Sequence, residues 1–313
     1  MTTNWNSILE TCVAIREFEV HIQELYKSDL IQSPVHLSIG QELICGIISN
    51  YSNQEDHFIG NYRSHGLSLA LSSDYNPIIL ELLAKRDGVS GGKAGSMHLS
   101  VPCRNMPWTS AIVGSGVPLS VGIADSLKRD NSSGIALVQF GDGALEEGCV
   151  MESLNLASVL SVPLLFVLED NSLAIHTPKE KRTSIEDYLN LSKSFGIESF
   201  DASYKDPLFL DSQYQQALNY VRTYKKPAFI RVECYRWLEH VGVDEDWHLG
   251  YRDKSELYQW KNCDIISNPG LVGISYDCVA EWQSKYRTLF KDRFKELSLS
   301  DDPSYSDLLN NVI

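Results

Sequence analysis

The hydrophobic positions in the first part of the chain recur every three or four residues, the spacing of a helix with one buried face. Ile8, Cys12, Ile15 and Ile22 follow this spacing and predict a helix over 6–28. A second helix is predicted over 77–86, with Pro77 near its start and Gly88 just past its end. The segment 112–127 is rich in small residues and predicts a tightly packed helix after a glycine turn.

From residue 135 onward, apolar runs alternate with amphipathic segments. The predicted strands cover 135–140, 164–168, 196–201 and 228–234, and the predicted helices cover 146–160 and 211–224. Apolar strands that alternate with helices indicate a parallel sheet covered on both faces. The predicted fold class is therefore α/β, with a mostly parallel central sheet. We expect an α/β domain over 1–266, including the N-terminal helical segment, and a C-terminal helical extension over 267–313.

Composition and charge exclude some classes of function. The 313 residues carry a net charge of −14, and the pI is about 5.0, which argues against a nucleic-acid or anionic-membrane surface. The N-terminus lacks the features of a signal peptide, and the apolar run 162–168 is too short to span a bilayer. The seven cysteines form no CxxC pair, as expected for reduced thiols. We therefore expect a cytoplasmic protein with no membrane and no nucleic-acid partner.

Polar residues follow two of the predicted strands. The stretch QFGDGALEEG, 139–148, places Asp142 between two glycines after the first strand, a sequence typical of a tight turn. Asn171 follows the next strand. A right-handed crossover brings both strand ends to one edge of the sheet, where ligands of α/β proteins collect. We therefore expect Asp142 and Asn171 to lie close together.

A carboxylate and an amide oxygen at one point suit Mg²⁺, which usually completes its octahedron with phosphate and water. Gly143 would let a phosphate approach the backbone, and the start of the predicted helix 146–160 would offer free N–H groups to it. The residues therefore predict a Mg²⁺-bridged phosphate ester at this edge.

The spacing of these residues resembles a known motif. GDG followed by an asparagine after 27 intervening residues is similar to the thiamine diphosphate motif. Five further stretches occur in the order found in the alpha subunit of the dehydrogenase component of 2-oxo acid dehydrogenase complexes, of the pyruvate, branched-chain and acetoin type: HLSIGQE (36–42), NYRSHG (61–66), GGKAGSMHL (91–99), IVGSGVPL (112–119) and YRWLEHVG (235–242). The resemblance covers about residues 10 to 266.

This resemblance implies a role for each matching residue. Mg²⁺ would be bound by the side chains of Asp142 and Asn171 and by the carbonyl oxygen of Leu173. The diphosphate would be held by backbone N–H groups of Gly143 and Ala144 and by Tyr62 and Arg63, and His240 would also bind the cofactor. The backbone of Val113 would contact the aminopyrimidine ring, and His36, His65 and His240 would face the reacting carbon. Histidines that titrate near neutrality suit the proton transfers of such a reaction.

Other residues have simpler interpretations. His98 is expected to stabilise a loop. For Tyr62 and Arg63, the alternative to binding the diphosphate is that they form a pair on the protein surface. The aromatic residues Tyr235, Trp237 and Trp247 are expected to be packing residues. The acidic residues between 239 and 256 predict a solvated surface loop.

The resemblance also implies partners. In that family the glutamate that activates the cofactor ring comes from a beta subunit, which implies an alpha2beta2 heterotetramer, and a lipoyl acyltransferase is a possible further partner. The sequence departs from the family in three places: MPWTSA (106–111) replaces a glycine-rich stretch, Leu238 replaces a histidine of the pyruvate enzymes, and Val241 replaces a regulatory serine of the mammalian enzymes. These departures leave the substrate open.

Two alternatives remain beside decarboxylation of a pyruvate-like 2-oxo acid. GDGALEEG also fits a transketolase-like or carboligase subunit that transfers a two-carbon unit to an aldehyde or keto sugar. A regulatory or structural homologue without activity is the other alternative, and the presence of Asp142, Asn171, Arg63 and His240 argues against it.

Overall fold

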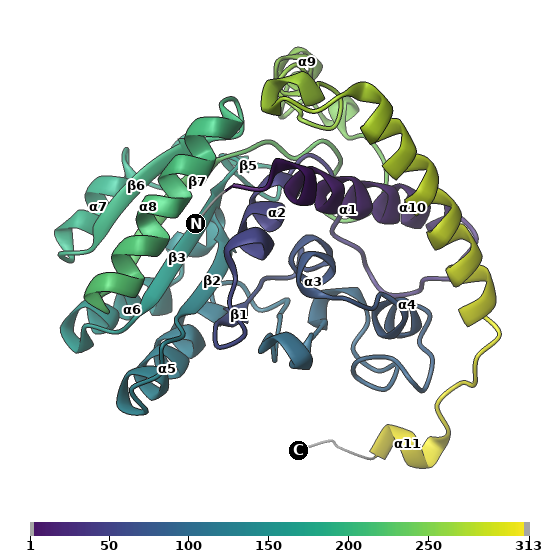
Figure 1. The fold of residues 1–313 in the computed structure, drawn as a ribbon, viewed down its shortest axis with the longest axis horizontal. Helices are drawn as coiled ribbons and strands as arrows, with labels where there is room; N and C mark the ends of the chain where they lie inside the picture. Colours follow the sequence, from purple (N-terminus) through teal and green to yellow (C-terminus); the bar gives the residue numbers. More distant parts are fainter. Residues whose placement is uncertain (1–2, 310–313) are drawn as a thin grey trace.

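The computed structural model describes residues 3–309, and its centre is a parallel β-sheet (Figure 1). The five strands lie in the order β1-β2-β3-β7-β6, and every neighbouring pair is parallel. Their bounds are β1 His57–Ile59, β2 Ala136–Gly141, β3 Leu164–Asp170, β6 Glu198–Ser203 and β7 Ala228–Glu233. Two short antiparallel strands, β4 Leu173–Ala174 and β5 Thr177–Pro178, form a separate hairpin. The predicted α/β class is confirmed, and β1 is a strand that the sequence pattern did not predict.

Helices cover both faces of the sheet, as the apolar strands require. On one face the core contains side chains of α1 Trp5–Tyr26, α2 Glu42–Tyr51, α8 Pro207–Tyr224 and α10 Tyr276–Leu297. On the other face it contains side chains of α5 Gly116–Arg129, α6 Gly148–Leu160 and α7 Tyr188–Ser194. Successive residues of β2 alternate between these two cores, with Leu137 in the first and Val138 in the second. The strands are therefore buried on both sides.

Shorter elements surround this frame. The remaining α-helices are α3 His65–Leu71, α4 Asn76–Leu82, α9 Lys254–Lys261 and α11 Tyr305–Leu309. The 3-10 helices are η1 Ser96–His98, η2 Pro102–Arg104, η3 Asp142–Glu146, η4 Lys179–Lys181, η5 Trp247–Leu249 and η6 Pro269–Val272. Among the helices of residues 3–309, none combines the length and apolar character needed to cross a membrane.

Several predicted helices have different starts or ends in the structure; the one predicted from 211, for example, begins at Pro207. The helix predicted over 77–86 ends at Leu82, and Ala84 has a left-handed φ of 54°. The buried Glu81 carboxylate then accepts hydrogen bonds from four backbone N–H groups of the following loop: those of Ser90, Gly92, Ala94 and Gly95. The helix predicted from 112 begins at Gly116, and the one predicted from 146 begins at Gly148.

The long helix α10, in the C-terminal part of the chain, packs against α1, beside which it lies in Figure 1. The rings of Phe290 and Phe294 lie 5.0 Å and 5.5 Å from the ring of Phe18, and all three side chains are buried. The predicted C-terminal extension therefore contributes to the same core as the N-terminal helix. This packing fixes α1, which carries residues that contact the segments around the site.

The cysteines behave as the sequence predicts. All seven are free thiols, and Cys12, Cys45 and Cys234 are buried in the core. Burial raises the pKa of each of these three thiols well above its ordinary value. They therefore pack as small apolar groups.

Candidate functional site

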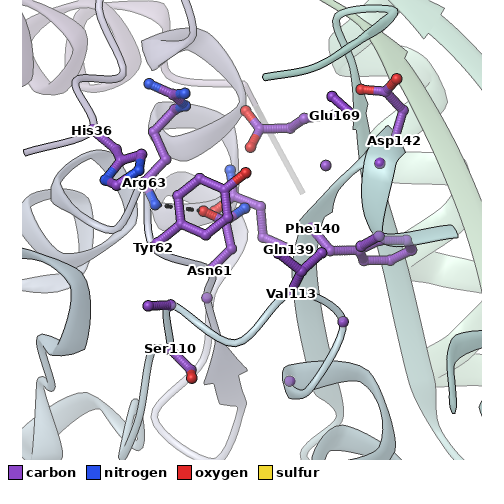
Figure 2. Close-up of a pocket in the computed structure, with 18 of the residues that line it drawn as sticks. His36, Asn61, Tyr62, Arg63, Ser110, Val113, Gln139, Phe140, Asp142 and Glu169 are labelled. Atoms are coloured by element: carbon purple, nitrogen blue, oxygen red, sulfur yellow. Dashed lines mark hydrogen bonds between the residues drawn. The ribbon is translucent and has the colours of Figure 1, made fainter. Parts of the chain in front are cut away.

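A cavity of about 360 Å³ lies at the carboxyl ends of β2 and β3 (Figure 2). Nearly all the residues that the sequence predicted for the site line it: His36, Tyr62, Arg63, Val113, Asp142, Gly143, Ala144, Asn171, Leu173 and His240. His65 does not line it. One cavity therefore brings together residues from distant parts of the chain, and its size is in the range of small-molecule sites.

One side of the cavity, which we call the strand-end wall, consists of Asp142, Gly143, Ala144, Asn171 and Leu173. Strands β2 and β3 pair in parallel with Gly141 opposite Glu169, so the residues that follow leave the sheet at the same edge. The Asn171 side-chain oxygen accepts a hydrogen bond of 3.0 Å from the Leu173 N–H, which fixes the start of the β4 segment. The predicted meeting of the two strand ends is confirmed.

The Gly-Asp-Gly turn differs from its expected geometry. Neither Gly141 nor Gly143 has a positive φ, so left-handed backbone is not the reason for these glycines. A Cβ atom on Gly143 would lie 2.9 Å from the Cβ of Ala174, whereas one on Gly141 would meet no atom within 4 Å. Gly143 is therefore required by the close approach of β4. The turn leads into η3 before α6 begins, so η3 supplies the backbone next to Asp142.

Asp142 is a buried carboxylate with one free oxygen. Its Oδ2 forms an ion pair with Arg182, which also pairs with Glu146. Its Oδ1 is buried and has no hydrogen-bond partner among the described residues. Burial and the nearby Asp170 charge raise the pKa of Asp142 to about 7, and Arg182 opposes this rise. Because a buried unpaired oxygen is unfavourable, Asp142 is suited to a cation.

The wall as a whole can supply few metal ligands of its own. Within residues 3–309 there is no group of three or more His, Cys, Asp and Glu side chains that could hold a metal ion. A cation at Asp142 would therefore depend on the Asn171 amide, on a backbone carbonyl and on oxygens from outside the chain. This set fits Mg²⁺ bridged to a phosphate, since Mg²⁺ seldom has an all-protein cage.

The opposite side of the cavity, which we call the loop wall, consists of His36, Tyr62, Arg63 and His240. Figure 2 shows His36, Tyr62 and Arg63 across from Asp142. The His36 ring lies 4.6 Å from the Tyr62 ring and 5.1 Å from the His240 ring. Arg63 donates hydrogen bonds to the carbonyl oxygens of Leu37 and His240. Arg63 thus joins the segments that carry the two histidines, and the alternative of a surface pair with Tyr62 is excluded.

Both histidines of the loop wall are neutral at pH 7. Burial and then the positive charge of Arg63 lower the pKa of His36 to about 3. Burial, Arg63 and Arg236 lower the pKa of His240 to about 3 as well. The expectation that these side chains titrate near neutrality is therefore wrong for this chain, because the cavity is partly desolvated and lies next to two guanidinium groups.

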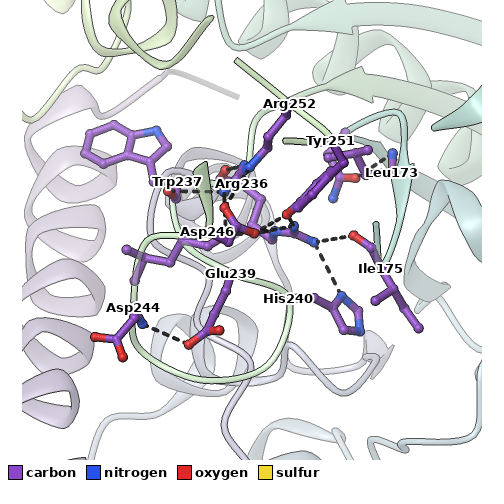
Figure 3. Close-up of polar contacts among 12 residues, drawn as sticks. Leu173, Ile175, Arg236, Trp237, Glu239, His240, Asp244, Asp246, Tyr251 and Arg252 are labelled. Carbon is purple, nitrogen blue, oxygen red and sulfur yellow. Dashed lines mark hydrogen bonds and ion pairs between the residues drawn. The ribbon is translucent and has the colours of Figure 1, made fainter. Parts of the chain in front are cut away.

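A buried network of charges holds His240 (Figure 3). Arg236 donates to His240 Nδ1 at 3.4 Å and to the Ile175 carbonyl at 3.2 Å. Because Nδ1 accepts this hydrogen bond, the proton of the neutral ring is on Nε2. Asp246, 1% exposed, pairs with both Arg236 and Arg252. The expectation that the acids of 239–256 form a solvated loop is therefore wrong for Asp246, which neutralises two buried arginines.

His65 lies outside the cavity, and its side chain is completely buried. Its Nδ1 is 3.2 Å from Glu19 Oε1 and its Nε2 is 2.8 Å from Ser96 Oγ, so both ring nitrogens have partners. The structure therefore does not bring His65 into contact with a molecule in the cavity.

The other singled-out side chains have structural contacts. His98 Nδ1 is 3.3 Å from the Thr109 carbonyl oxygen, which joins two loops as expected. Tyr235 stacks on Trp260 with ring centres 5.8 Å apart, and Arg16 lies over Trp237. Trp247 lies under the Arg252 guanidinium. These contacts agree with the interpretation of the aromatic residues as packing residues.

The sequence did not identify two charged residues of the site. Glu169, 5% exposed, lines the cavity between the two walls, and burial raises its pKa to about 7 against the effect of Arg63. Its position at the end of β3, just before Asn171, was a signal that it lies there. Arg182 had no such signal, because the contact with Asp142 joins residues 40 positions apart.

Comparisons with known proteins agree with this arrangement. Residues 10–271 match the family model described as dehydrogenase E1 component. The chain is 30% identical over 303 residues to a Rickettsia felis protein, covering 95% of this chain and 92% of that one. It is 32% identical over 256 residues to a Zymomonas mobilis protein (81% and 72%) and 30% identical over 248 residues to one from Rhizobium meliloti (79% and 70%). All three relatives are named pyruvate dehydrogenase E1 component subunit alpha.

Proposed function

The chain belongs to the dehydrogenase E1 component family, and from this premise we propose that it is the alpha subunit of an enzyme dependent on thiamine diphosphate and Mg²⁺. The enzyme decarboxylates a pyruvate-like 2-oxo acid and passes on the acyl or hydroxyalkyl unit. The observation that carries the proposal is that the strand-end wall and the loop wall line one cavity. A carboxylate with a free oxygen lies on one wall and two neutral histidines lie on the other.

The charged end of the cofactor would lie between the strand-end wall and the cationic part of the loop wall. We assign Mg²⁺ to the side chains of Asp142 and Asn171 and to the Leu173 carbonyl oxygen. The diphosphate is assigned to the backbone N–H groups of Gly143 and Ala144 and to Tyr62 and Arg63, and His240 is assigned to the cofactor as well. Arg63 and Arg236 are suited to this ligand, because their positive charges favour an anion in the partly buried cavity. The backbone of Val113 is assigned to the aminopyrimidine ring.

The loop wall would serve the reacting end of the substrate. Thiamine diphosphate, when bound, supplies the nucleophilic carbon and the electron sink for decarboxylation. His36 and His240 are neutral imidazoles that can donate or accept a proton beside the substrate carbonyl. Arg236 fixes the His240 ring so that Nε2–H is its free donor. The chain therefore binds, orients and exchanges protons.

We also propose that the chain acts with a beta subunit, as an alpha2beta2 heterotetramer in which the partner supplies the ring-activating glutamate. The names of the relatives mark each of them as an alpha subunit. Ile112 and Val113 at the cavity are 69% and 42% exposed, which is apolar surface that a partner would cover. A lipoyl acyltransferase is the proposed acceptor of the acyl unit.

The test is an assay of this chain purified together with the beta chain from the same genome. With thiamine diphosphate, Mg²⁺ and pyruvate, we expect reduction of an artificial electron acceptor by the complex and little turnover by this chain alone. Substantial decarboxylation without the beta chain would contradict the proposed division of the site.

Parallel reactions with pyruvate and an aldehyde test the alternative carboligase reaction. They are included because Ser110 and Ala111, from the stretch that departs from the family, line the cavity. Carbon–carbon bond formation without acceptor reduction would favour the carboligase. Acceptor reduction without a ligated product would support the 2-oxo acid dehydrogenase.

A further inference from the structure

A buried series of hydrogen bonds joins α1 to segments that line the cavity. His65, the first residue of α3, lies between Glu19 on α1 and Ser96 on η1, with its two ring nitrogens 3.2 Å and 2.8 Å from their side-chain oxygens. The exposed fraction of each of the three residues is 0%. We call this series the Glu19–His65–Ser96 relay. The Phe18 ring, 6.0 Å away, packs edge-on against His65.

The relay has a defined direction. Glu19 Oε1 also accepts hydrogen bonds from the backbone N–H of Ser38 at 2.8 Å and from Ser38 Oγ at 3.0 Å. A carboxylate oxygen only accepts, so the His65 Nδ1 carries a proton and donates it to Glu19. In the neutral ring, Nε2 then accepts from the Ser96 hydroxyl. The three side chains therefore form one oriented series that Glu19 terminates.

Each end of the relay is attached to a segment of the cavity wall. Ser38, bound by Glu19, lies two residues after His36. Ser96 lies next to Met97, which lines the cavity. The Ser64 hydroxyl donates to the Ser96 carbonyl oxygen at 2.7 Å, and Ser64 follows Arg63. A change inside the relay would therefore be transmitted to the segments that carry His36, Met97 and Arg63.

The serine, histidine and carboxylate are arranged as in a hydrolase triad. Ser96 is nevertheless completely buried and does not line the cavity, so no substrate carbonyl can reach its Oγ. The relay therefore has the hydrogen-bond order of a triad without access to a substrate. A nucleophilic role for Ser96 does not fit this burial.

On the basis of the proposed function, we propose that Glu19, His65 and Ser96 are positioning residues that hold His36 in its working place in the cavity. His65 therefore does not contact the substrate. It acts on His36 through Glu19 and Ser38. The rings of Tyr62 and His240 lie 4.6 Å and 5.1 Å from the His36 ring, and the positive charges of Arg63 and Arg236 act on it.

The first experiment observes His36 in the whole chain without any assay of activity. Long-range proton–nitrogen NMR spectra of the histidine-labelled chain are recorded at pH 7, with His36 assigned through His36→Gln. In Glu19→Gln and Ser96→Ala we expect new chemical shifts for the ring nitrogens of His36, because its ring is displaced in the cavity.

Matched controls come from α1 and α3, the helices that carry Glu19 and His65. Glu17→Gln changes a buried glutamate of α1 that pairs with Arg287, and Ser68→Ala changes a buried serine of α3 that lies beside Met106. Both should leave the His36 signals as in the parent chain. Unchanged His36 signals in Glu19→Gln and Ser96→Ala, with parent-like circular dichroism, would overturn the proposal. If Glu19→Gln fails to fold, Ser96→Ala tests the proposal by itself, because it removes only one oxygen atom.

A second experiment measures the complex with the beta chain. A displaced His36 should lower kcat for pyruvate about tenfold or more while KM stays within about twofold, because misplaced groups mainly reduce the rate of chemistry. A parent complex inactive on pyruvate would refute the proposed function, and the NMR result would still decide the role of the relay. Labelling of Ser96 by a fluorophosphonate would show an accessible nucleophile and would overturn the positioning role.

Discussion

The strand-end wall and the loop wall face each other across one cavity, yet they are built in different ways. Asp142 and Asn171 lie together because two neighbouring parallel strands end there, with Gly141 opposite Glu169. His36, Arg63 and His240 come from three separate loops outside the sheet, and a single isolated bridge, His36 to Gly242, pairs the backbones of two of them. Strand pairing within the sheet builds the first wall, whereas this bridge and the hydrogen bonds and ion pairs of buried side chains such as Arg63 and Arg236 build the second.

The two walls therefore differ in what keeps them in place. The strand-end wall needs the close approach of Gly143 to Ala174 and the single ion pair of Asp142 with Arg182. The loop wall needs buried charges behind it, above all Asp246 between Arg236 and Arg252. Removing one partner of such a group leaves an uncompensated buried charge, which is strongly unfavourable. Substitutions that affect only one wall test this distinction.

The largest effect is expected for Asp246→Asn, behind the loop wall. The substitution leaves Arg236 and Arg252 buried without a counter-charge and should lower the free energy of unfolding by about 3–5 kcal/mol. Urea unfolding followed by circular dichroism measures this change. The control Asp244→Asn, an exposed position in the same loop, should change stability by less than about 0.5 kcal/mol. Equal free energies of unfolding for the two variants would contradict the role of Asp246 as the counter-charge of Arg236 and Arg252.

The next effect concerns the strand-end wall and its proposed metal. Asp142→Ala removes the carboxylate with the free Oδ1 and should weaken Mg²⁺-dependent binding of thiamine diphosphate by about 100-fold or more, since even indirect changes at metal sites reduce affinity 10- to 100-fold. Calorimetry with the beta chain present measures it. Asp130→Ala, at an exposed position, is the control. Unchanged cofactor binding by Asp142→Ala would show that the metal is assigned to the wrong residue.

A matched glycine pair tests the backbone contact of the strand-end wall. Gly143→Ala places a methyl group 2.9 Å from Ala174 and should lower the free energy of unfolding by about 1–3 kcal/mol through overpacking. Gly141→Ala has open space and an extended φ of −85°, so it should be neutral within about 0.5 kcal/mol. Denaturant unfolding of both variants gives the comparison. Equal stability of the two would mean that the β4 segment moves aside freely.

The smallest effect is a pH dependence from the loop wall. His36 has a pKa of about 3 in the folded chain and about 6.5 when unfolded, so the unfolded state binds more protons below pH 6.5. Its contribution is constant above pH 6.5 and is lost as the pH falls from 6.5 toward 3. Between pH 7 and pH 5 the parent should lose about 1 kcal/mol more stability than His36→Gln, with allowance for solvent screening.

Unfolding by urea at pH 7 and pH 5 measures this difference between the parent chain and His36→Gln. The same substitution at His248, an exposed position, is the control for removing a histidine as such. A parent and a His36→Gln variant with parallel pH dependence would show that His36 is not held neutral by its surroundings.

Much of the fold was predictable from local patterns. The four predicted strands are present as β2, β3, β6 and β7, because apolar runs separated by helices need burial on both faces. The three-residue β1 was missed, since so short a run carries no periodic signal. Helix starts were less predictable than strands, because the GDG segment continues as η3 and α6 begins only at Gly148.

The site divides in the same way. By itself, the sequence determined the parallel sheet, the meeting of Asp142 and Asn171 and the family, because strand order along the chain and motif spacing are local properties. Only the tertiary structure decided that His65 is buried away from the cavity, that Asp246 lies between two arginines and that His36 and His240 are neutral. Burial and pKa depend on groups brought close by folding, such as Glu19 beside His65 and Arg63 beside His240, and no local pattern encodes those distances.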